Sequence, residues 1–241
     1  MRPLPWLDPD RIAFPPGETA FDEPPGLLAA GGALSPEWLE AAYAHGIFPW
    51  FDDDSPILWW CPEPRAVIRP GEARVGRTLR RRLKRDDYTV TLDTAFDAVI
   101  AACAAPREPG GGTWITADMV DAYRVLHRRG TAHSVEVWID GALAGGLYGV
   151  ALGRCFFGES MFTRVTDASK IAFVHLLGQL GAWGFPLVDC QMPNPHLDRL
   201  GVHTMDRATF LDEIEDLVHR PPVPGPWRLD WRWTDDRGAA S

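Results

Sequence analysis

The sequence predicts an α+β fold in which helices pack on a sheet that contains an antiparallel meander. Three strand-like runs follow one another, at residues 134–139, 142–151 and 155–162. The Asp140-Gly141 pair between the first two runs is a strong hairpin signal. A helix, a short strand and a second helix are predicted next, at residues 168–182, 187–191 and 207–219, with Asp206 as cap of the last. Elements in this order form a layer of helices on a sheet.

The N-terminal part is predicted to form a smaller domain over residues 1–70, followed by a larger one over residues 71–241. Its first 26 residues are rich in proline and lack periodic apolar positions, so we expect an extended arm. A short helix should follow, because Ser35 is a good N-cap and Pro36 fits the first helical position. Gly46 should end this helix.

Strands and helices are predicted to alternate between this helix and the meander. The strands are expected at residues 57–60, 66–68 and 88–92, and the helices at 74–85, 95–104 and 117–129. Residues 47–51 place three aromatic side chains in an expected loop. Thr116 can cap the helix that ends at Gly130.

Composition narrows the class of protein. The chain has 241 residues, 46% of them hydrophobic and 24% charged, which is ordinary for a soluble globular protein. No apolar run approaches the roughly 18–20 residues that a membrane helix needs, and the N-terminus does not resemble a signal peptide. The four cysteines are widely spaced, which favours reduced thiols in a cytoplasmic protein over disulfides or a metal site.

The charge is uneven along the chain. The net charge is −9, yet the segment from Arg69 to Arg85 holds eight of the 24 basic residues and one acid, Glu72. This asymmetry indicates a polyanionic partner, although a solvated helix face would also explain it. The candidate contacts are Arg74, Arg77, Arg80, Arg81, Lys84 and Arg85.

Three polar residues stand among apolar ones on predicted strands. Glu159 lies within the run Cys155–Phe162, and Asp189 and Gln191 alternate on the next strand. Because side chains two apart face the same side of a strand, we expect Asp189 and Gln191 to point together. A buried carboxylate needs a polar partner, so the pattern favours an apolar pocket with a charged floor for a ligand that is half hydrophobic and half cationic. The ordinary alternative is that Glu159 is a strand-edge acid paired with an arginine, and that Asp189 and Gln191 are polar residues at the end of a strand.

Phe162 and six further apolar side chains lie around these strands: Leu147, Phe156, Met161, Phe173, Leu176 and Val188. Such residues are more often plain core. Trp50 is less easily assigned to the core because it lies in an expected loop, where it could cover a ligand. Trp114, Tyr123 and Ser160 are weaker candidates for substrate contacts.

Nucleotide and zinc-hydrolase motifs are absent from the sequence. An energy-requiring reaction without a nucleotide site indicates a substrate that arrives already activated. No cofactor and no metal are expected.

Several uncommon sequence motifs follow one another along the chain: GIFPW at 46–50, WWCPEPR at 59–65, GTWI at 112–115, GGLYGV at 145–150, FGESMF at 157–162, ASK at 168–170 and DCQ at 189–191. From about residue 3 to 215 the chain closely resembles the bacterial leucyl/phenylalanyl-tRNA–protein transferases. The resemblance implies an N-acetyltransferase-like C-terminal domain with a smaller α+β domain before it. It also implies transfer of Leu or Phe, and less well Met, from aminoacyl-tRNA to the N-terminal Lys or Arg of proteins, which marks them for degradation.

The resemblance assigns roles to the candidate residues. The six apolar residues would hold the amino acid's side chain, with Trp50 near the terminal adenosine, and the basic helix would bind the tRNA backbone. Cys61 stands where the family often has Ser, and Leu147 where Met is common. A cytoplasmic monomer acting on aminoacyl-tRNA and protein acceptors, away from membranes, is expected.

We expect aminolysis of the tRNA ester by the acceptor's α-amine. Asp189 would polarise the Gln191 amide, which orients the amine, and Asp189 or water would take the proton. Glu159 would select the cationic acceptor or, alternatively, bind the donor. An N-acetyltransferase on the same fold is the runner-up, but residues 163–167 lack the glycines that a pyrophosphate turn needs. A noncatalytic tRNA-binding adaptor would leave Glu159 unexplained.

Overall fold

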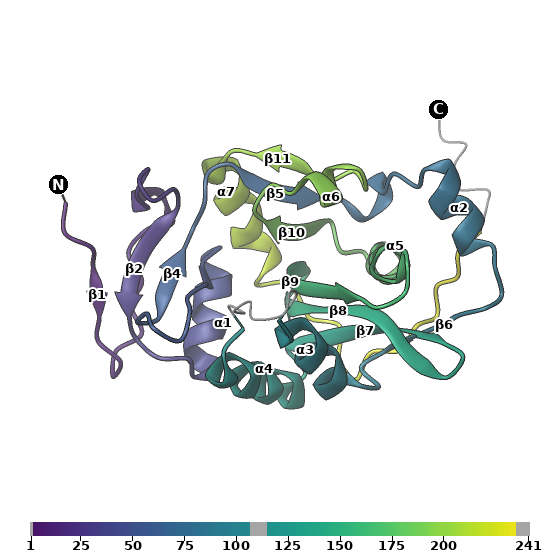
Figure 1. Cartoon of the computed structure of the whole chain (residues 1–241). Coiled ribbons are helices and arrows are strands. Elements are labelled where there is room, and N and C mark those ends of the chain that lie inside the picture. Colours follow the sequence, from purple (N-terminus) through teal and green to yellow (C-terminus); the bar gives the residue numbers. More distant parts are fainter. Residues whose placement is uncertain (1, 107–114, 235–241) are drawn as a thin grey trace.

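The computed structural model describes residues 2–106 and 115–234, and within them the strands form one sheet of four and one of seven (Figure 1). The smaller sheet is N-terminal and has the order β1-β2-β4-β3. The larger sheet has the order β11-β5-β10-β9-β8-β7-β6 and carries most of the helices. The expected α+β class, with a small N-terminal sheet and a larger C-terminal one, is confirmed.

The small sheet uses the proline-rich arm. Its strands are β1 (Trp6–Leu7), β2 (Leu27–Gly31), β3 (Phe48–Pro49) and β4 (Leu58–Trp60). β1 runs parallel to β2, and β4 is antiparallel to both β2 and β3. The expected loop at residues 47–51 is therefore partly wrong, because Phe48 and Pro49 pair with Trp60 and Trp59.

The first helix, α1 (Pro36–Ala44), forms as predicted. The Ser35 hydroxyl accepts a hydrogen bond from the Trp38 N–H, and Pro36 occupies the first turn, where its missing donor costs nothing. Its apolar stripe is buried, and Gly46, with φ of +68°, reverses the chain after it. A Cβ on Gly46 would lie 2.8 Å from Phe210 Cε1, so only glycine fits there.

The large sheet contains the predicted meander. Its strands are β5 (Arg65–Ile68), β6 (Thr89–Leu92), β7 (Ala132–Ile139), β8 (Ala142–Leu152), β9 (Cys155–Thr163), β10 (Leu187–Gln191) and β11 (His203–Met205). β7, β8 and β9 pair antiparallel, as expected, whereas β10 runs parallel to β9. β11 was not predicted. The division of the chain near residue 70 stays a prediction, and β5 belongs to the large sheet.

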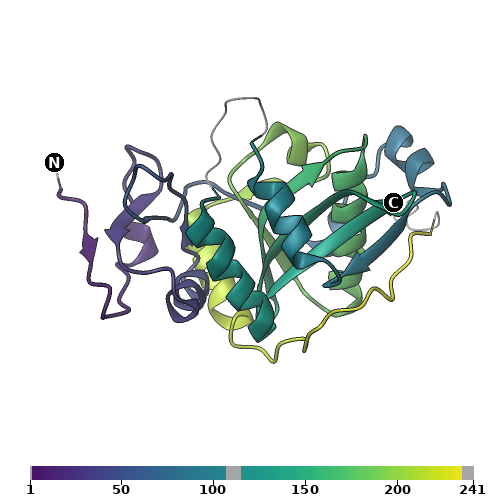
Figure 2. The same ribbon diagram turned by 60° about the horizontal axis from the view of Figure 1, so that its bottom comes forward.

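Helices cover both faces of the large sheet (Figures 1 and 2). They are α2 (Arg77–Leu83), α3 (Phe96–Ala104), α4 (Ala117–Arg129), α5 (Ala168–Ala182), α6 (Pro195–Asp198) and α7 (Arg207–Leu217). One buried cluster unites α1, α3, α4 and α7 with residues such as Val150 and Phe157 on one face. A second unites α2 and α5 with Phe156 and Val188 on the other face. The alternation of strand side chains thus separates two cores.

Two helices differ from the sequence prediction. α2 is shorter than the predicted helix at 74–85, because Gly76 occupies its N-cap and Lys84 its C-cap. The short α6 was not predicted; at its start the Asn194 side-chain oxygen accepts from the His196 N–H. Thr116 and Gly130 cap α4 as predicted.

α5 approaches the sheet closely at its first residue. A Cβ on Gly145 of β8 would lie 2.6 Å from the Cβ of Ala168, so glycine is needed for this contact. On the opposite side, the ring of Trp231 lies over Gly178, where a Cβ would come within 2.2 Å of the indole. The Gln179 side-chain oxygen accepts from the backbone N–H groups of Asp230 and Trp231, each at 2.8 Å. The segment after α7, yellow in Figure 2, thereby packs on the outer side of α5 and is hydrogen-bonded to it.

The thiols agree with the sequence prediction: Cys61, Cys103 and Cys155 are buried, Cys190 is partly buried, and all four are unbridged. In the part of the chain that the structure describes, no helix is long and apolar enough to cross a membrane.

Candidate active site

A cavity of about 910 Å³ is lined by β8, β9 and β10 of the large sheet. α5 contributes to its wall from one face of that sheet, Ala102 and Cys103 of α3 contribute from the other, and Trp50 lies at its edge. All seven residues that the sequence proposed as an apolar pocket line this cavity: Trp50, Leu147, Phe156, Met161, Phe173, Leu176 and Val188.

The strand register explains the convergence of the apolar side chains. Leu147 on β8 lies opposite Met161 on β9, and Phe156 on β9 lies beside Val188 on β10. α5 adds Phe173 and its neighbour one turn on, Leu176. Since Phe156, Phe173, Leu176 and Val188 are almost fully buried, the wall is apolar and firmly packed.

Trp50 follows β3 and is 37% exposed. Its ring lies 5.3 Å from that of Trp60, and its backbone oxygen accepts from the Trp60 indole N–H at 2.6 Å. An exposed aromatic side chain held by a neighbouring indole is placed to cover a planar ligand. Trp114, a further candidate, lies outside the described residues.

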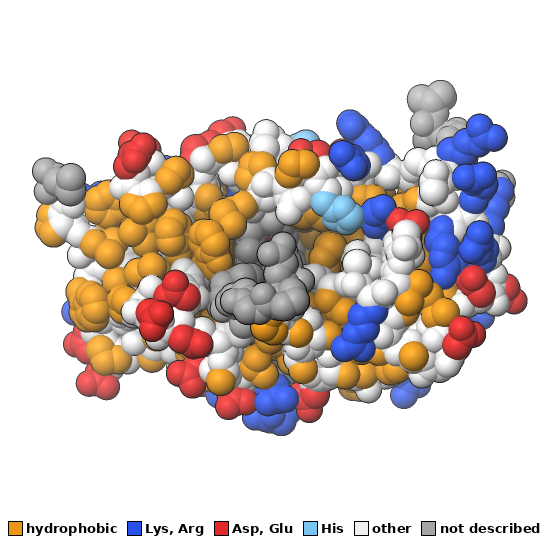
Figure 3. Space-filling model, in the orientation of Figure 1, with side chains coloured by type: hydrophobic (Ala, Val, Ile, Leu, Met, Phe, Trp, Pro, Cys, Tyr) orange, Lys and Arg blue, Asp and Glu red, His pale blue; other side chains and the backbone are white. Residues whose placement is uncertain are grey.

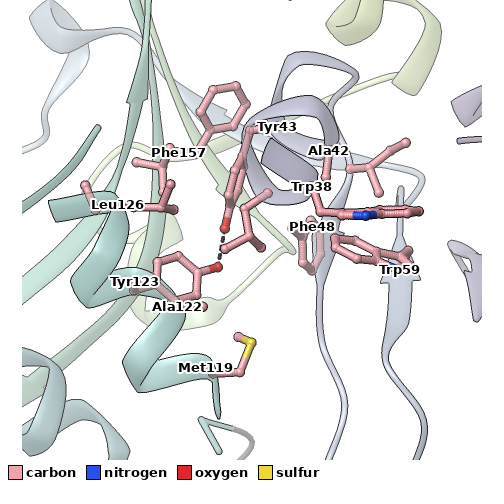
Figure 4. Packing of buried hydrophobic residues seen from close by; sticks show 14 of the residues in the cluster. Trp38, Ala42, Tyr43, Phe48, Trp59, Met119, Ala122, Tyr123, Leu126 and Phe157 are labelled. Carbon is pink, nitrogen blue, oxygen red and sulfur yellow. Dashed lines mark hydrogen bonds between the residues drawn. The ribbon is translucent and has the colours of Figure 1, made fainter. Parts of the chain in front are cut away.

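Glu159 lies in the wall of the cavity and accepts three hydrogen bonds. Tyr43 donates to Oε1 at 2.7 Å, Tyr123 to Oε2 at 2.9 Å, and the Gln191 Nε2 to Oε1 at 2.7 Å. The two tyrosine hydroxyl oxygens also lie against each other (Figure 4). Because each hydroxyl has one proton, both can donate to Glu159 and bond to each other only when the Glu159 carboxyl group is protonated and donates in turn. Tyr43 comes from α1 and Tyr123 from α4, so elements on the far side of β9 fix the carboxylate.

Burial raises the pKa of Glu159 to about 7, against the opposing effect of hydrogen bonds from Tyr43 and Tyr123. The charge of Asp189 raises it further. Near neutral pH this carboxyl group is therefore close to half ionised, and it can both accept and release a proton.

Asp189 does not line the cavity. Its carboxylate accepts from the Arg65 Nε at 2.8 Å and the Arg65 Nη2 at 2.6 Å, and both residues are fully buried. Arg65 also lies over the rings of Phe48 and Phe210, 5.1 Å and 4.4 Å from their centres. A paired, buried carboxylate of this kind is held in place and shielded from substrate.

The expectation that Asp189 and Gln191 face the same side is wrong. β10 is bulged between them, so that Asp189 lies opposite Val67 and Gln191 opposite the adjacent Ala66. Gln191 has a φ of 64°, and its backbone N–H, not its side-chain amide, donates to Asp189 Oδ1 at 2.8 Å. The side chain of Gln191 thereby turns into the cavity, towards Glu159.

Two members of this network were not predicted from the sequence. Tyr43 lies in the helix predicted to begin at Pro36, but nothing in the sequence singled it out, and Arg65 appeared only as part of a motif. Arg65 did leave a signal, since a lone arginine directly before the apolar run Ala66–Ile68 needs a buried anion. Tyr123 was a candidate for substrate contact; it reaches Glu159 instead of lining the cavity, whereas Ser160 does line it.

The candidate tRNA contacts gather at the end of the molecule where α2 lies, and Lys and Arg side chains crowd that end in Figure 3. Arg74, Arg77, Arg81, Lys84 and Arg85 are exposed or partly exposed there, as is Arg80. Leu79 and Leu83 are buried against the second core. Arg82, in contrast, pairs with Asp87.

Comparison with known proteins points to one family. The family model described as leucyl/phenylalanyl-tRNA protein transferase matches residues 67–215, and the model of that transferase's N-terminal domain matches residues 32–63. The leucyl/phenylalanyl-tRNA–protein transferase of Aromatoleum aromaticum is 56% identical over 227 residues, which cover 94% of this chain and 95% of the relative. That of Azoarcus sp. strain BH72 is 56% identical over 234 residues, covering 95% and 99%.

Solved structures give fainter similarities. A GCN5-related N-acetyltransferase from Kribbella flavida is 13% identical, with a TM-score of 0.35 over 69% of this chain and 59% of that one. L-PGS from Bacillus licheniformis is 11% identical, with a TM-score of 0.38 over 66% and 51%. Because a TM-score below 0.5 does not establish a common fold, the fold is defined by the strand order of the two sheets.

Proposed function

This chain belongs to the leucyl/phenylalanyl-tRNA–protein transferase family, and we propose that its cavity joins an aminoacyl-tRNA to a protein acceptor. The enzyme is an aminoacyltransferase that moves Leu or Phe from its tRNA onto a protein. The observation that carries the proposal is the meeting, in one cavity, of an apolar wall and the hydrogen-bonded pair of Glu159 and Gln191.

The apolar part of the cavity is the seat for the transferred amino acid's side chain. Phe156, Phe173, Leu176 and Val188 form a surface that offers a ligand no hydrogen-bonding side chain. Burying a Leu or Phe side chain there stabilises the complex by roughly 1.5–3 kcal/mol. A charged or polar side chain would lose its hydration without replacement, so the wall selects Leu and Phe, and less well Met.

The ester end of the donor lies towards Glu159 and Gln191. The acceptor's neutral α-amine attacks the ester carbonyl carbon, a C–N bond forms, and the bond from that carbon to the ribose oxygen breaks. The proton lost by the amine passes to Glu159, directly or through water, and is returned to the leaving ribose oxygen. With a pKa of about 7, Glu159 is matched to both transfers.

Gln191 and Asp189 position the reactants. The Gln191 nitrogen is used by Glu159, so the carbonyl oxygen of the same amide is the end that can accept a hydrogen bond from the attacking amine. Asp189 acts through Gln191 by holding its backbone N–H. Orientation of this kind supplies much of the rate for a reactive ester.

Glu159 also supports selection of acceptors with N-terminal Lys or Arg. A carboxylate can accept about four hydrogen bonds, and three are used by Tyr43, Tyr123 and Gln191. The remaining position on Oε2 suits a cationic acceptor. A contact with the donor's amine or ribose is the competing role.

The exposed cations around α2 would bind the tRNA backbone through its phosphates. They lie at one end of the molecule and contact the ligand outside the cavity, so they contribute affinity with little sequence preference.

The test is transfer of labelled Leu from charged tRNA to a peptide that begins with Lys, with a peptide that begins with Ala as control. We expect labelled product with the first peptide only. Binding of charged tRNA without transfer would contradict the proposal and support an adaptor. Kinetics of Glu159→Gln then separate the two roles of the carboxylate. A raised KM for the peptide supports acceptor selection, and a raised KM for the donor assigns Glu159 to the donor.

A further inference from the structure

The start of α5 opens into the same cavity and is not capped by a side chain. Asp167 occupies the N-cap position with a φ of 69°, and its carboxylate is turned to the Lys170 Nζ at 2.6 Å, away from the helix end. The first N–H groups of a helix have no partner within it, and at this end nothing from the Asp167 side chain replaces that partner. Since α5 runs for 15 residues, its positive end is well formed.

Ser169, the second residue of α5, is the observation that points to a ligand. It is only 6% exposed, it lines the cavity, and no hydrogen bond joins its hydroxyl to any described residue. Buried hydroxyls are normally hydrogen-bonded. A hydroxyl of a largely buried residue that faces the cavity and has no partner among the described residues is placed to donate to a bound molecule.

Arg164 brings a cation to the lining of the cavity beside Ser169, from the end of β9. Lys170 follows Ser169 in the chain, and its ammonium is shared with the Asp167 carboxylate. His196 lines the cavity from α6, and burial and then the charges of Lys170 and Arg199 lower its pKa, so near pH 7 it offers a neutral hydrogen-bonding ring. An anion beside α5 would therefore meet Arg164 and the start of the helix.

We propose that the start of α5, with the Ser169 hydroxyl and the Lys170 ammonium, binds the 5′-phosphate of the donor's terminal nucleotide. The inference rests on the proposed function, because it takes the donor to be an aminoacyl-tRNA whose ester lies near Glu159. That phosphate is one ribose away from the ester, and Glu159 and Ser169 line one continuous cavity. The subsite anchors the donor between the apolar seat and the distant α2.

The test compares the binding of two non-reactive donor analogues by calorimetry. They are adenosine carrying phenylalanine through a 3′-amide, and the same molecule with a 5′-phosphate. With the unaltered enzyme we expect the phosphate to lower Kd by about ten- to a hundredfold, as charge-assisted hydrogen bonds do. Equal Kd values for the two analogues would overturn the proposal.

Variants locate the effect. Ser169→Ala and Lys170→Ala should each remove a several-fold part of the gain from the phosphate, and the double variant most of it. The Kd of the analogue without phosphate should stay unchanged, which shows that the cavity is intact. Arg128→Ala, which removes an exposed cation from α4, is the control for net charge and should keep the full gain. A gain that survives in the double variant contradicts the subsite.

Two further measurements distinguish this subsite from a site for free anions and from a failure of transfer. Inorganic phosphate added to the analogue without phosphate should not tighten its binding; tightening equal to that of the covalent phosphate would overturn the proposal and assign the position to a free anion. Transfer from charged tRNA is measured separately. An enzyme that transfers amino acids but gains nothing from the 5′-phosphate contradicts the subsite alone, whereas absence of transfer contradicts the proposed function.

Discussion

Glu159 is buried in the wall of the cavity and accepts hydrogen bonds from Tyr43, Tyr123 and Gln191. Its pKa is raised from 4.5 to about 7 because the charged form loses its hydration. Between these two values the folded protein holds a proton that the unfolded chain has released. The free energy of unfolding therefore falls as pH rises through this window, by on the order of 3 kcal/mol, and is flat above it.

Glu159→Gln removes this ionisation, so its stability relative to the unaltered protein should rise between about pH 5 and 7. Urea denaturation at several pH values measures the difference. Replacement of the exposed Glu215 by Gln is the control and should leave the pH dependence as it was. An unchanged slope in Glu159→Gln would show that the carboxyl group titrates at its ordinary pKa.

Arg65 and Asp189 form a fully buried ion pair, and each depends on the other. Arg65→Met should destabilise the protein by about 3–5 kcal/mol, because it leaves the Asp189 carboxylate buried without its cation. The turnover number should fall as well, since Asp189 holds the backbone of Gln191. The double variant Arg65→Met, Asp189→Asn should regain part of the stability in thermal denaturation. A double variant no more stable than the single one would show that the unpaired carboxylate is not the cause.

At the scale of elements, α2 presents its cations outward and its leucines inward. Replacing Arg77, Arg81 and Lys84 together by Ala should weaken tRNA binding and flatten its dependence on salt, by about one unit of the logarithmic slope for each phosphate that the variant no longer binds. The three side chains lie on the outer face, so folding should be unaffected. Filter binding at a series of salt concentrations tests this. Normal binding by the triple variant would mean that the helix is only a solvated face.

The close contact between α5 and the C-terminal segment gives a second prediction for an element. In Gly178→Ala the new Cβ would lie 2.2–2.5 Å from atoms of the Trp231 indole, so the ring must leave its place. We expect a loss of stability of about 1–3 kcal/mol and a raised KM for the donor, because Phe173 and Leu176 on α5 line the cavity. Gly181→Ala, whose nearest contact is Pro70 Cβ at 3.3 Å, is the milder control. Equal stability and KM in the two variants would show that the indole does not fasten α5.

Helices and strands were predictable where the residues that define their ends are neighbours in the sequence. The caps of α1 and α4 and the Asp140-Gly141 hairpin each depend on neighbouring residues, and all three form as expected. β11 was missed because its pairing partner, β5, is distant in the sequence, and β3 because two residues ending in a proline are too short to show a period. Periodicity alone carries no information about such partners.

The candidate site was predictable to the same limit. The strand residues that line the cavity follow from the alternation of apolar side chains, and Glu159 and Gln191 from polar residues in apolar strands. The opposite directions of Asp189 and Gln191 were not predictable, because a single bulge in β10 turns Gln191 away from the side that Asp189 faces. Bulges are set by pairing with a neighbouring strand, here β5, and leave no fixed mark in the sequence.

At the scale of the whole molecule, charge is divided between its ends. The chain has a net charge of −9, while the end near α2 is basic (Figure 3). Transfer from charged tRNA should therefore slow steeply as salt is raised, and transfer from an aminoacyl-adenosine, which does not reach α2, should change little. Initial rates for the two donors at matched salt concentrations measure this. A parallel decrease with both donors would show that the salt acts at the cavity.

The hydroxyl groups that hold Glu159 have a consequence for what a protein shortened to its large sheet would retain. One comes from Tyr43 in the N-terminal part, and the other from Tyr123 in the part that carries the cavity. A version of the protein reduced to the large sheet would keep the apolar wall of the cavity. It would lose Tyr43, one of the two hydroxyl donors that lower the pKa of Glu159. The small N-terminal unit would thus be a component of the proposed reaction centre, because without it Glu159 is held by one hydroxyl fewer.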